Sequence, residues 1–219
     1  MILNSLVEGN SVRGTSRLCG VEPRTVLNML KLAGENCERL LTENIQNVRV
    51  RDLELDEVWT FVGCKQKRLT PERVEAGTAG DAYTFIALER TSKLVVAWHL
   101  GTRDRINTED FVSKIRWATA PGRFDVSTDA FLPYENAIDA GLYDRANHAQ
   151  IVKLFSTHLG HLSESYSPAK FVSVAKDTIN GMPDLDRAST SHVERKNGTL
   201  RQWCKRLTRL TYAFSKSWA

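Results

Sequence analysis

The sequence predicts an α/β protein in which a mixed β-sheet is flanked by helices, with a small helical region at the N-terminus. After residue 47, segments rich in β-branched and aromatic residues alternate with segments of helical periodicity. Before it, the chain carries helix start signals and no strand-like run. A length of 219 residues suits one main domain with a small appended region. We therefore predict a helical region over residues 1–46 and a main domain over 47–219.

The N-terminal region is predicted to contain two helices joined by a tight turn. Ser11 suits the cap of a short helix, and Cys19 and Gly20 suit the turn that ends it. Pro23 suits the first turn of a longer second helix. This pattern is typical of a helix-turn-helix that binds the major groove of DNA, and equally of an ordinary helical hairpin. The residues presented to a groove would be Arg24, Thr25, Asn28 and Lys31.

Three strands are predicted in the first half of the main domain. The run VRVRDLELDEVWTFVG, over residues 48–63, is rich in β-branched and aromatic residues. A polar segment with proline and glycine, over 65–81, predicts a long hairpin loop. The runs YTFIALER and KLVVAWHLG, over 83–90 and 93–101, predict two more strands with a tight connection. Three successive strands favour an antiparallel meander.

The second half is predicted to alternate helices and strands. The elements expected are a crossover helix over 108–119, a strand over 124–129, a helix over 132–142, a short strand over 151–155, a helix over 167–179, a loop over 180–190 and a last helix from 191. Ser167 and Pro168 are the start signal for the helix over 167–179. Gly198 is expected to kink the last helix. Its inward positions are predicted to be Val193, Leu200, Leu207 and Leu210.

Composition excludes several classes of protein. Apolar residues make up 42% and charged residues 26% of the chain, which is ordinary for a globular protein and unlike a disordered or collagenous one. No run of eighteen apolar residues and no signal-peptide pattern is visible, so we expect a cytoplasmic protein without a membrane partner. The four cysteines are widely spaced, which argues against a zinc ribbon and against a disulfide framework.

Positive charge is concentrated near the C-terminus. The net charge is only +4, but residues 194–216 carry seven Lys or Arg against the single acid Glu194. A basic segment of this kind predicts contacts with the phosphates of nucleic acid, and hence salt-dependent binding. The residues predicted to contact DNA are Arg24, Lys31, Arg195, Lys196, Asn197, Arg201, Lys205, Arg206 and Arg209.

Three acidic residues occupy positions that suit a metal site. Asp56 lies inside the first predicted strand, Asp129 ends the fourth, and Glu194 lies on the basic last helix. If the first and fourth strands are neighbours, the two aspartates face each other with Glu194 over them. Carboxylates at that spacing repel unless a cation bridges them, and such ligands suit Mg²⁺ or Mn²⁺ in two-metal phosphodiester chemistry. Spacing alone equally fits a surface acid, a turn cap and a helix salt bridge.

Four segments of the sequence are distinctive as motifs: DEVWTFVG over 56–63, STDAFLPY over 127–134, SHVERKNGTLR followed by RLTRLTYAFSK over 191–216, and the opening LVEGNSVRGTSRLCGVEPRTV over 6–26. Together they resemble the bacterial insertion-sequence-one family of transposases. The resemblance covers nearly all of the chain. It implies an RNase H-like core in which Asp56, Asp129 and Glu194 are the catalytic and metal-binding triad for two Mg²⁺ or Mn²⁺ ions.

The resemblance also implies the reaction and the partners. The reaction would be metal-dependent nicking at the ends of an insertion element, which frees a 3′ hydroxyl, followed by attack of that hydroxyl on target DNA. The partners would be the double-stranded terminal repeats, the target DNA and further copies of the chain in a synaptic complex.

The sequence departs from the family at four places. It lacks the family's cysteine zinc ribbon, and it carries Leu55 and Ala130 where relatives have Cys and Gly. The interval from Asp129 to Glu194 is longer than in the namesake, so an insertion is expected to loop out over 150–186. The chain ends at SKSWA, where relatives continue, which indicates a truncated copy. Two alternatives therefore stay open: an inactive truncated transposase that represses by binding element ends, and a structure-selective nuclease.

Overall fold

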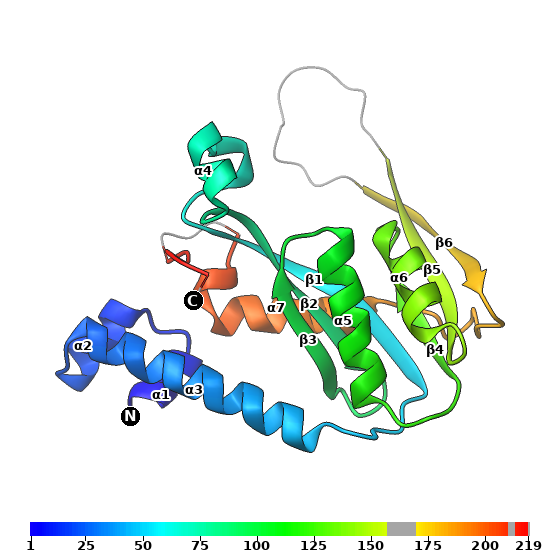
Figure 1. Ribbon diagram of the computed structural model, residues 1–219, viewed down its shortest axis with the longest axis horizontal. Helices are drawn as coiled ribbons and strands as arrows, with labels where there is room; N and C mark the ends of the chain where they lie inside the picture. The colour runs from blue at the N-terminus through cyan, green and yellow to red at the C-terminus, as the bar shows by residue number, and fades with distance from the viewer. Residues whose placement is uncertain (157–169, 210–212, 219) are drawn as a thin grey trace.

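The computed structural model describes residues 1–156, 170–209 and 213–218. Within them a six-stranded sheet has the order β3-β2-β1-β4-β5-β6, and helices lie on both of its faces (Figure 1). The strands are β1 Asp52–Val62, β2 Gly80–Glu89, β3 Val95–Gly101, β4 Phe124–Thr128, β5 Ala146–Ser156 and β6 Lys170–Asn180. The helices are α1 Ile2–Val7, α2 Val12–Cys19, α3 Pro23–Asn44, α4 Pro71–Ala76, α5 Arg105–Ala118, α6 Pro133–Leu142 and α7 Ser191–Trp203.

The sheet is mixed, as the sequence predicts. Strands β1, β2 and β3 form an antiparallel meander, β4 and β5 run parallel to β1, and β6 runs antiparallel to β5. The first and fourth strands are neighbours, which is the condition under which the two aspartates were expected to meet, but β1 and β4 pair only over Asp52–Glu54 and Asp125–Ser127. Over residues 55–61, β1 pairs with β2 alone within the described part of the chain, and its last residue, Val62, forms an isolated parallel bridge with Ser215. Among the described residues, no strand therefore lies beside β1 on its other edge over 55–61.

Both faces of the sheet are covered, and this explains the mixed pattern of β1. Leu53 and Leu55 belong to the larger core cluster, which includes Phe111 of α5 and Ile138 of α6. Val58 belongs to a second cluster on the α7 side of the sheet. Successive side chains of a strand point to opposite faces, so apolar residues are required on both. The acids of β1 thus lie within otherwise apolar layers.

The signals for α2 and α3 are confirmed. The Ser11 hydroxyl caps α2 by accepting a hydrogen bond from the Gly14 amide at 3.0 Å, and Gly20 ends the helix with φ +64°. Pro23 is the first residue of α3, which runs for 22 residues. The three N-terminal helices stand to one side of the sheet (Figure 1).

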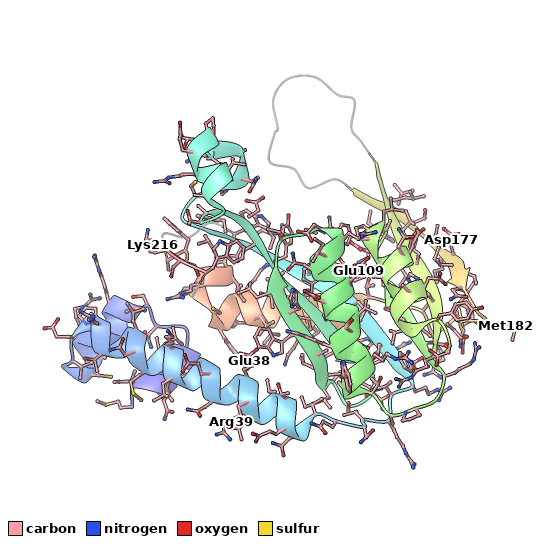
Figure 2. The ribbon with its side chains drawn as sticks, in the orientation of Figure 1. Glu38, Arg39, Glu109, Asp177, Met182 and Lys216 are labelled. Atoms are coloured by element: carbon pink, nitrogen blue, oxygen red, sulfur yellow. The ribbon has the colours of Figure 1, made fainter. Side chains whose placement is uncertain are left out.

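Most of α3 is exposed. Val26 is buried, whereas Leu27 and Leu32 are 44% and 53% exposed. Figure 2 shows Glu38 and Arg39 projecting from the part of α3 nearer the sheet. The four residues predicted to face a groove, Arg24, Thr25, Asn28 and Lys31, are all exposed. No helix in the described part of the chain combines the length and apolar character needed to cross a membrane.

The predicted helix over 167–179 is wrong. Its residues from Lys170 onward form β6, which pairs with β5 along the edge of the sheet. The start signal at 167–169 lies outside the described residues. Pairing with β5 and the β-branched Val172 and Val174 outweigh the local helix signal. The interval expected to loop out over 150–186 is therefore largely sheet where the structure describes it.

Smaller differences concern the other connections. The loop predicted over 65–81 contains a 3-10 turn, Gln66–Arg68, and the short helix α4. Helix α7 runs without interruption through Gly198. Val193 is fully buried, and Leu200 and Leu207 pack against its cluster, as predicted. Leu210 lies outside the described residues.

Candidate metal centre

A cavity of about 570 Å³ opens where β1 passes the end of β4. The three acids predicted from the sequence, Asp56, Asp129 and Glu194, all line it. The rest of its wall includes Glu57, Lys153, Thr190, Asn197, Arg201 and Arg209. The fold thus brings β1, the turn after β4 and helix α7 together around one polar space.

The closest acids are Asp56, Glu57 and Asp129. Each offers a carboxylate oxygen, and these oxygens all lie within 4.8 Å of one another. Glu57 was not predicted as a site residue, because alternation along a strand places it on the face opposite Asp56. Both side chains nevertheless reach the cavity, because no neighbouring strand in the described part of the chain lies between them and the cavity at this edge of β1. Asp129 also accepts a hydrogen bond from the Phe131 amide at 3.1 Å, which caps the turn into α6.

Glu194 faces the same cavity without joining this cluster of close oxygens. Its Oε1 forms an ion pair with the Lys153 ammonium on β5 and accepts a hydrogen bond from the Thr190 hydroxyl at 2.7 Å. Its negative charge nevertheless helps to raise the pKa of Asp56. Lys153 was missed by the sequence analysis, because a lysine on a strand gives no signal of a partner on a distant helix.

Burial makes negative charge unfavourable in this site. It is the main cause that raises the pKa of Asp56 to about 6, and the charge of Asp129 adds to it. Burial likewise raises the pKa of Glu57 to about 7, again with a contribution from Asp129. The Asn197 amide partly offsets the effect at Asp56, to which it donates a hydrogen bond at 2.7 Å. Asn197, predicted to contact DNA, is buried, and its amide is committed to Asp56.

Arg103 supplies a positive charge between two of the acids. Its Nε lies 3.1 Å from Glu57, and a terminal nitrogen lies 3.4 Å from Asp129. The other Glu57 oxygen is buried and has no hydrogen-bond partner among the described residues, although the Tyr134 hydroxyl partly offsets the rise in the pKa of this carboxyl. A buried carboxylate oxygen without a partner, among other carboxylates, fits a hard divalent cation such as Mg²⁺ or Mn²⁺.

Glu54 holds the beginning of α7 against β1. Its carboxylate is buried and accepts hydrogen bonds from the backbone amides of His192 and Val193 at 2.8 and 3.0 Å. It also bonds the His192 ring at 2.7 Å. Thr190, at the cap position of α7, makes no capping bond through its side chain. Glu54 therefore caps the helix that carries Glu194, and its role was not foreseen from the sequence.

Neither of the two histidines near the site lines the cavity. The His192 ring is bonded to Glu54. The His148 ring is fully buried on β5 and bonds the Thr128 hydroxyl at 2.8 Å, and burial lowers its pKa to about 4. Both rings are structural groups.

The positive wall of the cavity consists of Arg201 and Arg209 together with Lys153. Burial and the charge of Arg209 lower the pKa of Arg201, whose Nε is buried and has no hydrogen-bond partner in the part of the chain that the structure describes. Two adjacent guanidinium groups facing a cavity are suited to a phosphate. The other predicted DNA contacts near this end, Arg195, Lys196, Lys205 and Arg206, lie on α7 or in the turn after it and do not line the cavity.

Comparison of the chain with protein-family models and with curated proteins gives no match.

Replacement of Glu54 by alanine is expected to disturb the whole centre. The Glu54→Ala protein leaves two buried backbone amides without an acceptor, which should lower the free energy of unfolding by roughly 3 kcal/mol. It should also weaken Mn²⁺ binding in calorimetric titrations, because α7 carries Glu194. The matched control is Glu89→Ala, since Glu89 is a buried strand acid that bonds only its own turn, at Thr91 and Ser92. An equal loss of Mn²⁺ affinity in both variants would contradict the role of Glu54.

The raised pKa of Glu57 predicts that the metal-free protein loses stability as the pH rises. The folded state holds this proton more tightly than the unfolded state, so the stabilisation is complete below about pH 4.5 and is lost as the pH rises through about 7. The free energy of unfolding of wild type should therefore fall relative to that of Glu57→Gln by roughly 3 kcal/mol across that interval. Urea titrations in a chelator from pH 4.5 to 8 measure it.

Glu89 supplies a control that should stay flat in this experiment. Burial alone would raise the pKa of Glu89, but hydrogen bonds from Ser92 and Thr91 outweigh it and lower the pKa from its ordinary value of 4.5. The stability that this carboxylate contributes is lost only as the pH falls below about 4.5, so the curves for wild type and Glu89→Gln should run parallel from pH 4.5 to 8. If the free energies of unfolding of wild type and Glu57→Gln change in parallel over the whole pH range, the raised pKa of Glu57 is contradicted.

Proposed function

We propose that the protein is a DNA transposase of the DDE type with an RNase H-like core. The observation that carries the proposal is that Asp56, Asp129 and Glu194, from three separate parts of the chain, line one cavity together with Arg201 and Arg209. The mixed sheet with helices on both faces is compatible with that core. The sequence words that resemble the insertion-sequence-one family assign the same three acids.

The acids of the cavity are suited to hold a pair of Mg²⁺ or Mn²⁺ ions. When bound, such a pair would activate the attacking oxygen and stabilise the leaving oxygen in the cleavage of a phosphodiester. Asp56 and Asp129 would be ligands from the sheet, and the Asn197 amide would orient the carboxylate of Asp56. Glu194 would complete the set once its oxygen is released from Lys153.

The positive groups would bind the substrate. Arg201 and Arg209 would hold the phosphate at the cavity, with the acids on the opposite side. Along the duplex, the groups on and after α7, Arg195, Lys196, Lys205 and Arg206, would contact further phosphates. On α3, Arg24 and Lys31 would contact the terminal repeats. The partners proposed are thus the element ends, the target DNA and further copies of this chain that bring two ends together.

Two displacements at phosphorus make up the proposed reaction. In the first, a water oxygen bonds to the phosphorus at the element end, and the bond from that phosphorus to the 3′ oxygen breaks. In the second, the freed 3′ hydroxyl attacks a phosphodiester of the target and displaces another 3′ oxygen. The positive wall would hold the phosphate in line for both steps.

One observation favours the second candidate function, an inactive copy that occupies element ends as a repressor. Glu194 is bound by Lys153 and Thr190 instead of standing among the close acids. A chain locked in this state would retain its basic surfaces and bind DNA without cutting it.

Nicking of supercoiled plasmid DNA in Mn²⁺ distinguishes the two functions. We expect the wild type to nick and Asp129→Ala to be slower by at least roughly 100-fold, since a metal ligand supports several kcal/mol of charge stabilisation. The control is Glu109→Ala, because Glu109, labelled on α5 in Figure 2, is as exposed as Asp129 (44% against 43%). Equal rates for wild type and Asp129→Ala would leave only the repressor.

Removal of Lys153 tests whether this ion pair restrains Glu194. Lys153→Met frees the Glu194 carboxylate and removes a positive charge from the cavity, so Mn²⁺ affinity should rise by roughly 3- to 10-fold. Lys176→Met is the matched control: Lys176 pairs with Ile151 on the same hairpin and bonds only backbone carbonyls of 185 and 186. Isothermal titration with MnCl₂ measures both, and an unchanged or weaker affinity in Lys153→Met would contradict the restraint.

A further inference from the structure

A second cavity, of about 480 Å³, lies on the ribbon formed by β1 and β2. It is lined by Trp59, Lys65, Gln66, Lys67 and Asp81. Trp59 follows Glu57 by two residues, so both side chains leave β1 on the same face, about 7 Å apart along the strand. None of the residues that line this cavity belongs to the metal centre or to the basic C-terminal segment.

The cavity is lined by the aromatic ring of Trp59, which contacts a second aromatic ring beside it. The Trp59 indole is partly exposed, and its centroid lies 5.9 Å from that of Phe61. Phe61 is nearly buried and packs at 4.8 Å against Phe214 from the C-terminal segment. Across the ribbon, Trp59 stands opposite Tyr83. The indole therefore presents a flat surface whose position is held by its aromatic neighbours.

The rim of the cavity is positive and held in place. The Lys65 ammonium lies 5.3 Å from the centroid of the Trp59 ring, and Lys67 follows on the same turn. Two hydrogen bonds join this turn to the start of β2: the Gln66 amide donates to Asp81 at 2.9 Å, and the Asp81 amide donates to the Gln66 side chain at 3.4 Å. A cation thus already lies over the aromatic face, with a second one beside it.

A series of side-chain contacts connects the two cavities. Arg103 bonds Glu57 and Asp129 in the metal centre, and its guanidinium carbon lies 6.0 Å from the centroid of Tyr83. Tyr83 is the neighbour of Trp59 across the ribbon. A DNA strand whose phosphate occupies the metal centre would therefore direct an adjoining nucleotide toward the indole.

We propose that this cavity binds an unpaired nucleobase of the DNA strand that enters the metal centre. The base stacks on Trp59 in place of the Lys65 ammonium, and Lys65 and Lys67 turn to the phosphates on either side of it. An aromatic platform beside cations is the arrangement that binds single strands with little regard to sequence. The identity of the strand rests on the proposed function, but the stacking itself needs no metal. The site would therefore favour DNA whose bases are unpaired next to the scissile phosphate.

Fluorescence of a 2-aminopurine base tests the proposal in a chelator. Full-length protein is titrated into a single-stranded oligonucleotide that contains the probe, and wild type should quench the probe on binding. Trp59→Ala should bind this oligonucleotide roughly 10- to 100-fold more weakly and lose the quenching, whereas Trp59→Phe should retain most of both. Trp117→Ala is the control, since Trp117 lies on α5, is 84% exposed and lines neither cavity.

Equal affinity and equal quenching for wild type and Trp59→Ala would overturn the proposal. If Trp59→Ala proves unfolded in thermal melting, the double variant Lys65→Gln, Lys67→Gln takes its place, and unchanged binding by it overturns the proposal equally. The two proposals fail separately. Nicking that does not depend on Asp129, with binding that depends on Trp59, removes the transposase and keeps the base site. The reverse pair of results removes the base site alone.

Discussion

The bond between Glu54 and the first turn of α7 is the constraint on which the candidate site depends. A buried carboxylate on a strand is costly unless something compensates it, and the free amides at the beginning of a helix do so here. These hydrogen bonds fix the position of the first turn of α7 on the sheet. Glu194 and Asn197 follow within five residues, and Asn197 thereby reaches Asp56.

The charges of the cavity are compensated only in part. Arg103 bridges Glu57 and Asp129, and Lys153 pairs with Glu194, yet the pKa values of Asp56 and Glu57 are raised to about 6 and about 7. Acids that are retained where burial makes their negative charge unfavourable, when apolar residues would be more stable there, are typical of functional positions. A cation among the acids would remove the cost, and the two arginines across the cavity would then face a bound phosphate. The short pairing of β4 makes this possible, because it leaves the edge of β1 open.

Local sequence patterns determined most of the elements and the candidate triad. The alternation of β1, the acid that ends β4 and the polar start of α7 are signals that lie within a few residues of each other, as are the Ser11 cap and Gly20 turn of α2. They predicted an α/β fold, and three acids that would meet if the first and fourth strands were neighbours. Spacing alone left other roles open for these acids, and the family resemblance assigned Asp56, Asp129 and Glu194 to one site. The DNA contacts and the reaction stay predictions.

The tertiary structure alone decided which side chains meet. Residues 170–180 form β6 because β5 offers them a partner, which a local helix signal does not report. Glu57 joins Asp129 because the edge of β1 is free, and Lys153 holds Glu194 across 41 residues of chain. Hydrophobic periodicity and helix-capping residues indicate only the local conformation of a segment. The pairing of strands and the seating of α7 depend on surfaces assembled from distant segments, so no window of the sequence contains them.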